Sequence, residues 1–207
     1  MLKDAPKAIS RAQALSEFTV VETTIQEENP TLIYPDVLAT AYGFLATEFS
    51  VDRDLAANEA KIFGGSVGKW QPFPDTVSAL AVLSKHFKLV VLSNVDQGSF
   101  SHTRKLLEKG FTFDMVCTAQ DIGSYKPDIR NFEYVLKSVK EKFGIEREEV
   151  LVTAQSLSHD HVPANKLGLG SAWIDREGAH VGVDETLATF TFRYRTLGEL
   201  AAAVEKE

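Results

Sequence analysis

After Asp75 the sequence alternates between helical runs and short apolar segments that have the length of β-strands. The apolar segments cover residues 89–92, 115–118, 150–153 and 171–174. Strands separated by helices pair in parallel and are covered on both faces, so this alternation predicts an α/β fold with a mostly parallel sheet. Residues 189–194 alternate polar and apolar side chains, which predicts a half-buried edge strand, and a closing helix is expected over 197–204.

The N-terminal part of the sequence predicts helices alone, because apolar residues recur at helical spacing between positions 9 and 67. Pro30 and Pro35 separate the first two helices, and Gly64–Gly65 ends the third, where we expect a left-handed C-cap. The segment 70–75 then carries two prolines around an aromatic residue. We therefore expect a helical cap domain over 1–70 and a core domain over 71–207.

Composition narrows the classes of partner. The chain has 207 residues, a formal net charge of −7 and interspersed charges, which argues against a nucleic-acid or anionic membrane surface and favours a small-molecule substrate. We find no signal peptide and no apolar stretch near the roughly 18 residues of a membrane span. The single cysteine, Cys117, lies in an apolar run and is expected to be a buried, inert thiol. We expect a cytoplasmic protein.

Polar residues follow three of the predicted strands, at the sheet edge where doubly wound folds place their chemistry. Ser93 and Asn94 follow the first strand, and Lys126 lies in the segment Gly-Ser-Tyr-Lys-Pro-Asp after the second. Asp160 lies in the segment Ser-Leu-Ser-His-Asp after the third.

In order and spacing these segments resemble the second, third and fourth motifs of the haloacid-dehalogenase-like (HAD) superfamily. Residues 70–75, 92–96 and 123–128, together with 154–164, resemble its type II haloacid dehalogenase-like branch, which is common in fungi. The resemblance covers nearly the whole chain and implies a helical cap on a Rossmann-like core. It also implies that Ser93 bonds the transferring group, Lys126 neutralises the surroundings of the nucleophile, and Asp160 orients water or a metal.

The family's nucleophilic aspartate, at the end of a first strand, has no good match in this sequence. Asp4 lacks an apolar strand before it, and Asp52 and Asp54 lie between helical runs, where Asp52 is expected to be a helix N-cap. Without that segment we expect no aspartyl intermediate, no metal and no cofactor.

A sheet without its first strand has unpaired edges. Neighbouring strands could close the gap, the N-terminal segment could replace the strand, or a second chain could contribute, so a homodimer is one alternative. A sequence truncated at its N-terminus is another explanation.

Three residues are the candidates for catalysis. Asp160 lies between two histidines and could act as a general acid, although it could instead cap the helix that begins near Val162–Pro163. Glu22 is the second acid. Lys126 would keep Asp160 ionised if the two side chains face each other, or it could be a surface lysine before a proline turn.

Six further residues are expected to line the pocket between cap and core. They are Ser93, Asn94, Tyr34, Trp70, Phe73 and Gln26. Ser93 and Asn94 could hold a substrate oxygen or bond the backbone instead. For the three aromatic residues the alternative is packing between cap and core. Gln26 shares a helix face with Glu22, and solvated positions are the alternative for both.

These residues and the resemblance predict a non-hydrolytic HAD-like enzyme of fungal specialised metabolism. The predicted reaction is acid-assisted isomerisation or cyclisation of a small apolar intermediate, for example by epoxide opening, in which aromatic side chains stabilise a cation. An inactive HAD-like binding module and a HAD hydrolase or dehalogenase truncated at its N-terminus are the alternatives.

Overall fold

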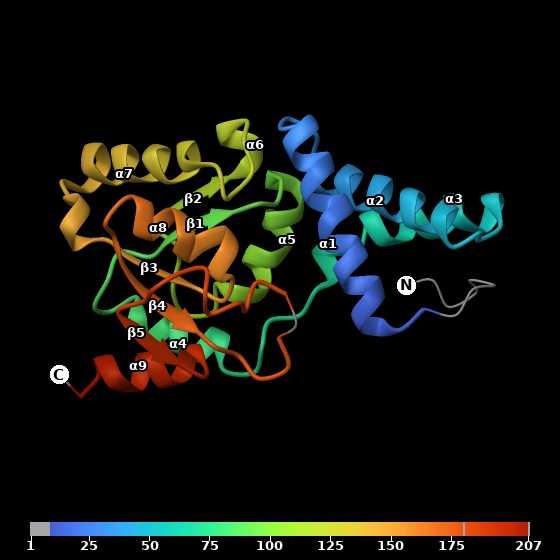
Figure 1. Cartoon of the computed structure of the whole chain (residues 1–207). Helices are drawn as coiled ribbons and strands as arrows, with labels where there is room; N and C mark the ends of the chain where they lie inside the picture. Colours follow the sequence, from blue (N-terminus) through green and yellow to red (C-terminus); the bar gives the residue numbers. More distant parts are fainter. Residues whose placement is uncertain (1–8, 180, 207) are drawn as a thin grey trace.

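The computed structural model describes residues 9–179 and 181–206, and Asp4 lies outside them. Three helices come first: α1 (Arg11–Glu28), α2 (Tyr34–Glu48) and α3 (Arg53–Gly64). They pack together at one end of the molecule, and α1 also lies beside the remaining elements (Figure 1). Within the described part of the chain, none of the helices is both long and apolar enough to cross a bilayer.

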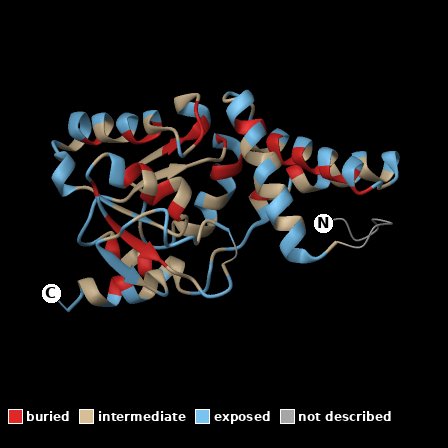
Figure 2. Cartoon of the chain, viewed as in Figure 1, coloured by how far each residue is buried: buried red, intermediate tan, exposed pale blue. Residues whose placement is uncertain are grey.

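Local sequence sets the ends of these helices. Asp52 accepts hydrogen bonds from the N–H groups of Asp54 and Leu55, so the prediction of an N-cap is confirmed. The left-handed C-cap is wrong, because Gly65 has a φ of −76°. Gly64 is needed for another reason: a Cβ there would lie 2.4 Å from the carbonyl oxygen of Pro35. The lack of a side chain lets α3 approach α2 closely. Six residues of α2 are buried (Figure 2).

Strands and helices alternate in the rest of the chain, as expected. A 3-10 turn (Val67–Lys69) leads to these elements: α4 (Thr76–Leu83), β1 (Val90–Ser93), α5 (Gln97–Leu107), β2 (Met115–Thr118), α6 (Ala119–Ile122), α7 (Ile129–Phe143), β3 (Leu151–Ala154), α8 (Val162–Lys166), β4 (Gly170–Ile174), β5 (Phe192–Tyr194) and α9 (Leu197–Val204). A short 3-10 helix (Arg147–Glu149) precedes β3, and a short π-helix (Leu157–His161) follows it. This is the predicted α/β class with a Rossmann-like core and a helical cap.

The parallel strands form two sheets instead of one. β1 pairs with β2, and β3, β4 and β5 form the second sheet in that order. The break lies between β1 and β3, which do not pair with each other, so these strands do not close the gap. The predicted edge strand is shorter than expected, because only Phe192–Tyr194 pairs with β4. The N–H of Thr189 instead bonds the side chain of Asn165.

Two of the apolar clusters formed by the described residues position the elements around the strand ends. One lies between α4, β4 and α9 and contains Ala79, Leu83, Ala172, Ile174, Leu200 and Ala201. The other joins the first two helices to the core, because Ile25 and Val37 pack with Ala119 and Tyr125. Each large side chain that is fully buried contributes roughly 1.5–3 kcal/mol. The second cluster fixes α1 next to the carboxyl ends of β1 and β2, and the division at residue 70 stays a prediction.

Candidate active site

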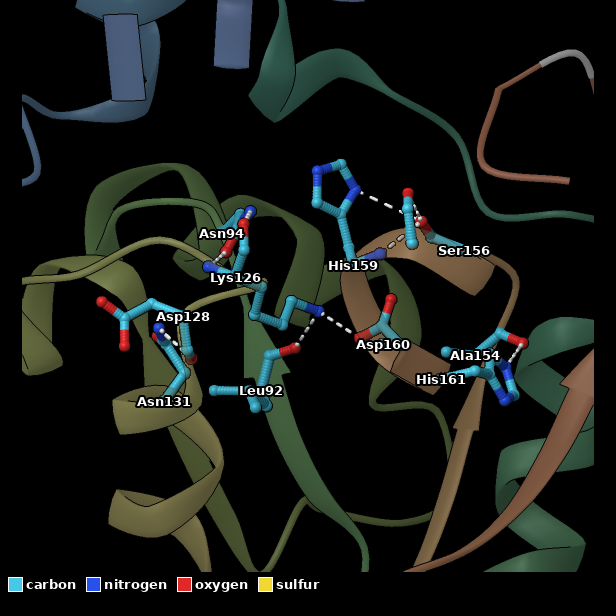
Figure 3. Close-up of polar contacts among 11 residues, drawn as sticks. Leu92, Asn94, Lys126, Asp128, Asn131, Ala154, Ser156, His159, Asp160 and His161 are labelled. Carbon is cyan, nitrogen blue, oxygen red and sulfur yellow. Dashed lines mark hydrogen bonds and ion pairs between the residues drawn. The ribbon is translucent and has the colours of Figure 1, made fainter. Parts of the chain in front are cut away.

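A buried ion pair lies at the carboxyl ends of β1 and β3. The Nζ of Lys126 is 2.7 Å from Oδ1 of Asp160 and donates a second hydrogen bond, of 3.0 Å, to the carbonyl oxygen of Leu92 (Figure 3). The two charged side chains are only 11% and 12% exposed. The lysine therefore connects the two sheets across their break and satisfies a carbonyl on the unpaired edge of β1.

Asn94 fixes the backbone of Lys126. Its Oδ1 accepts a hydrogen bond of 2.7 Å from the Lys126 N–H, and its Nδ2 donates one of 3.1 Å to the Lys126 carbonyl oxygen. Both ends of the amide are thus used on the backbone, which was the alternative to substrate binding for this residue. Asn94 orients the lysine and also forms part of the cavity wall.

The turn after β3 directs its acidic and basic side chains to different places. Ser156 accepts a hydrogen bond from the His159 N–H and lies 3.2 Å from its Nδ1. His161 points the other way, to Ala154 and Ser171, while Asp160 faces Lys126 (Figure 3). Burial lowers the pKa of His159, so its neutral form is favoured.

The prediction that Asp160 caps the next helix is wrong, because His161 is the N-cap of α8 and its side chain makes no capping bond. Pro163 does lie in the first turn, as expected. Asp160 accepts its hydrogen bond from an ammonium group, and this geometry suits an electrostatic role better than proton donation.

The opposite wall comes from α1 and α2. The Tyr34 hydroxyl donates a hydrogen bond of 2.7 Å to Glu22. Burial raises the pKa of Glu22, and the bond from Tyr34 only partly offsets that rise. Burial and the neighbouring carboxylate likewise raise the pKa of Tyr34. Glu22 is thus a candidate for holding a proton.

These side chains enclose a cavity of about 180 Å³ between cap and core. Its lining residues are Glu22, Gln26, Tyr34, Asn94, Lys126, His159 and Asp160. Six of them are residues that the sequence predicts for the site, and their roles in binding or catalysis stay predictions. His159 was missed as a site residue, although it adjoins Asp160 in the same motif.

Three predicted residues do not line this cavity. Ser93 is the partly buried last residue of β1. The exposed Trp70 packs its ring edge-on against Tyr34, with 6.5 Å between ring centroids. The exposed Phe73 lies under the guanidinium group of Arg176, at 4.0 Å. The two aromatic residues thus contact Tyr34 and Arg176, and neither lines the cavity with the Lys126–Asp160 pair.

The described side chains around the cavity do not by themselves form a divalent-cation site. Within residues 9–179 and 181–206, no group of three or more His, Cys, Asp or Glu side chains could hold a metal ion. Asp160 already accepts a hydrogen bond from Lys126, and Glu22 accepts one from Tyr34.

Cys117 is unsuited as a nucleophile, because it is buried and burial raises the pKa of its thiol to about 11.

A helical cap over a Rossmann-like core, with charged side chains gathered at the strand ends beneath the cap, defines a class of capped α/β proteins. The family model of haloacid dehalogenase-like hydrolases matches residues 48–174. The chain belongs to this family.

Relatives and solved structures agree with that assignment. The chain is 31% identical over 110 residues to the glyceraldehyde 3-phosphate phosphatase of Methanothermobacter thermautotrophicus, an alignment covering 52% of this chain and 46% of the relative. It is 26% identical over 131 residues to the (S)-2-haloacid dehalogenase of Pseudomonas putida, covering 63% and 55%. The chain thus spans about half the length of these curated relatives.

The fold is similar to that of the L-2-haloacid dehalogenase of Xanthobacter autotrophicus. The TM-score is 0.71 at 17% sequence identity, over 94% of this chain and 85% of that structure. At this identity the likeness shows the fold alone.

Proposed function

We propose that this protein is a hydrolase and that its reaction takes place in the cavity beneath α1. The observation that carries the proposal is the buried Lys126–Asp160 pair, which places an ammonium group at the carboxyl ends of β1 and β3. The relatives named above are a phosphatase and a haloacid dehalogenase. The substrate class that we propose is therefore a phosphate ester or a 2-haloacid.

Lys126 would act through its charge. A fixed, largely desolvated cation stabilises negative charge that develops on a reacting group, and no reorganisation is required during the reaction. Its Nζ is held by Asp160 and by the Leu92 carbonyl, and its backbone is held by Asn94. These three contacts give the ammonium group the defined position that such a role requires.

Hydrolysis through a covalent intermediate also needs a nucleophile. Asp160 and Glu22 are carboxyl groups of the cavity wall, but the first is paired with an ammonium group and burial raises the pKa of the second. We therefore assign the nucleophilic role to neither of them and propose that the nucleophile acts at the break between β1 and β3. The break in hydrogen bonding between β1 and β3 supports this assignment.

The test uses protein expressed from the complete reading frame. Release of chloride from 2-chloropropanoate and of phosphate from p-nitrophenyl phosphate are measured for the unsubstituted protein and two variants. Lys126→Ala is expected to lower kcat by about 100-fold or more, while Lys137→Ala, at an exposed lysine of α7, keeps full activity. The proposal is refuted if neither product appears, or if both variants are equally active. Ligand binding without turnover would instead favour an inactive binding module.

Glu22 supports a second candidate, which is acid-assisted isomerisation or cyclisation of a small apolar substrate such as an epoxide. Its raised pKa and its place in the cavity are what a general acid needs. The relatives support hydrolysis instead. An isomerised product that is lost in Glu22→Gln and retained in Asp160→Asn would favour this candidate. Fungal specialised metabolism, the cytoplasmic location and the homodimer stay predictions.

A further inference from the structure

A second hollow, of about 600 Å³, runs along the first half of α1. Six residues of α1 between Arg11 and Val20 form one wall, and Val181 and Gly182 form the other. We call this hollow the α1 groove. It is more than three times as large as the cavity that contains Lys126, and the proposed reaction leaves it unexplained.

One face of α1 forms a wall of both the groove and the cavity. Leu15 and Thr19 line the groove, whereas Glu22 and Gln26 line the cavity. The successive spacings of four, three and four residues place these side chains in one row on the helix. Because a helix rises about 1.5 Å per residue, Leu15 lies about 10 Å along the axis from Glu22. The groove and the cavity therefore follow one another along the same face of α1.

The second wall of the groove is bonded to the wall of the cavity as well. The carbonyl oxygen of Gly182 accepts a hydrogen bond of 2.7 Å from the N–H of Leu157. A Cβ on Gly182 would lie 2.6 Å from Oγ of Ser156, which itself contacts His159 in the cavity wall. The segment that borders the groove is thus bonded to the turn that carries His159 and Asp160.

Four apolar side chains line the groove, together with Arg11, Ser16 and Thr19. Val20 is 62% exposed and Val181 is 38% exposed, and Leu15 and Ala12 lie beside them. The cavity is smaller than the roughly 300–1,000 Å³ of ordinary ligand pockets, whereas the groove falls within that range. The cavity therefore has room for a reactive head group, and the groove has room for an extended apolar portion attached to it.

We propose that the α1 groove binds the alkyl tail of an amphiphilic substrate whose anionic head occupies the cavity beside Lys126. The identity of the reacting head rests on the proposed function, but the binding of the tail does not. The substrate class is then a medium-chain aliphatic acid or alkyl phosphate, which is more extended than glyceraldehyde 3-phosphate or a short haloacid.

The test measures binding without requiring turnover. Isothermal titration calorimetry is performed with butanoate, hexanoate and octanoate, and with butyl, hexyl and octyl phosphate. A methylene group that becomes half to fully buried strengthens binding by about two- to fourfold. Each step in a series adds two methylene groups, so it is expected to lower Kd by at least about fourfold. The two head groups distinguish a carboxylate from a phosphate ligand.

A matched pair of variants locates the effect. Val20→Asp places a charge in the groove, and Ile62→Asp places the same charge on α3, outside the groove, at a β-branched apolar position that is 61% exposed. Val20→Asp is expected to abolish the dependence of Kd on chain length and to leave the binding of the butyl ligands unchanged. Ile62→Asp is expected to retain the full dependence.

Equal affinity for short and long ligands in both series, or an equal loss in the two variants, would overturn the inference. The outcome is separable from that of the proposed function. Chain-length dependence that is lost only in Val20→Asp upholds the groove even where no hydrolysis is detected. Hydrolysis with an affinity independent of chain length overturns the groove and leaves the hydrolase proposal intact.

Discussion

Replacement of Lys126 by methionine tests whether the ion pair at the break between the sheets holds the two halves of the core together. Methionine keeps an unbranched side chain of similar length, so the change removes the charge and its hydrogen bonds while largely retaining the packing. Asp160 then becomes a buried carboxylate without its cation, and the Leu92 carbonyl loses its donor. Both losses act on the folded state, so we expect a less stable protein.

The magnitude follows from the burial of the pair. Removing one partner of a buried ion pair destabilises a protein by about 3–5 kcal/mol, and an unsatisfied buried carbonyl adds about 1–3 kcal/mol. The two side chains are 11% and 12% exposed, so water can reach them partly and the lower end applies. We expect a loss of about 4 kcal/mol, which for a chain of this size lowers Tm by about 8–16 °C.

Urea and thermal unfolding, followed by circular dichroism, measure this loss. A double-mutant cycle with Asp160→Asn separates the pair from its surroundings. The double variant carries neither charge, so it is expected to be more stable than the sum of the two single losses predicts, with a coupling energy of about 1.5–3 kcal/mol.

Lys140→Met is the control, because Lys140 and Glu146 form an ion pair of nearly the same length, 2.8 Å, that is 63% and 55% exposed. Solvent screens such a pair, and its loss is expected to leave the free energy of unfolding unchanged. Equal unfolding curves for Lys126→Met and Lys140→Met, or a coupling energy of zero in the cycle, would refute the reasoning.

Three further predictions follow from burial and packing. Glu22→Gln is expected to raise Tm at pH 7 but not below about pH 4.5. Burial raises the pKa of Glu22 above 4.5 in the folded protein. The stability that the neutral carboxyl group confers at low pH is therefore lost as pH rises through the folded-state pKa. A Tm difference independent of pH would contradict this. The Cys117 thiol, with its pKa raised to about 11, is expected to react with Ellman's reagent at pH 8 only as fast as the protein unfolds, and rapid labelling of the native protein would disprove it. Gly64→Ala is expected to lower the free energy of unfolding in urea by about 1–3 kcal/mol because its Cβ meets the Pro35 carbonyl, whereas Gly43→Ala, with open space around its Cβ, raises it by up to about 1 kcal/mol. Equal effects of the two alanines would argue against the close approach of α3 to α2.

Features that depend on neighbours in the sequence could be predicted from the sequence. The apolar runs placed four of the strands, because strand and helix periodicity are properties of a local segment. Asp52 was identified as a helix cap and Pro163 as a first-turn residue for the same reason. The order of the motifs also placed Lys126 and Asp160 at one edge of the sheet, because parallel strands bring their carboxyl ends together, but it left open whether the two side chains meet.

The tertiary structure alone decided how these pieces combine. The split of the sheet between β1 and β3, the use of the Asn94 amide on the Lys126 backbone and the exclusion of Trp70 from the cavity depend on contacts between segments far apart in the chain. Local periodicity carries no information about such contacts. The α1 groove could not be predicted from the sequence for the same reason. Its second wall comes from Val181 and Gly182, which follow α1 by more than 150 positions. Sequence thus determined the family and the chemical groups, and long-range packing determined which of those groups share a cavity.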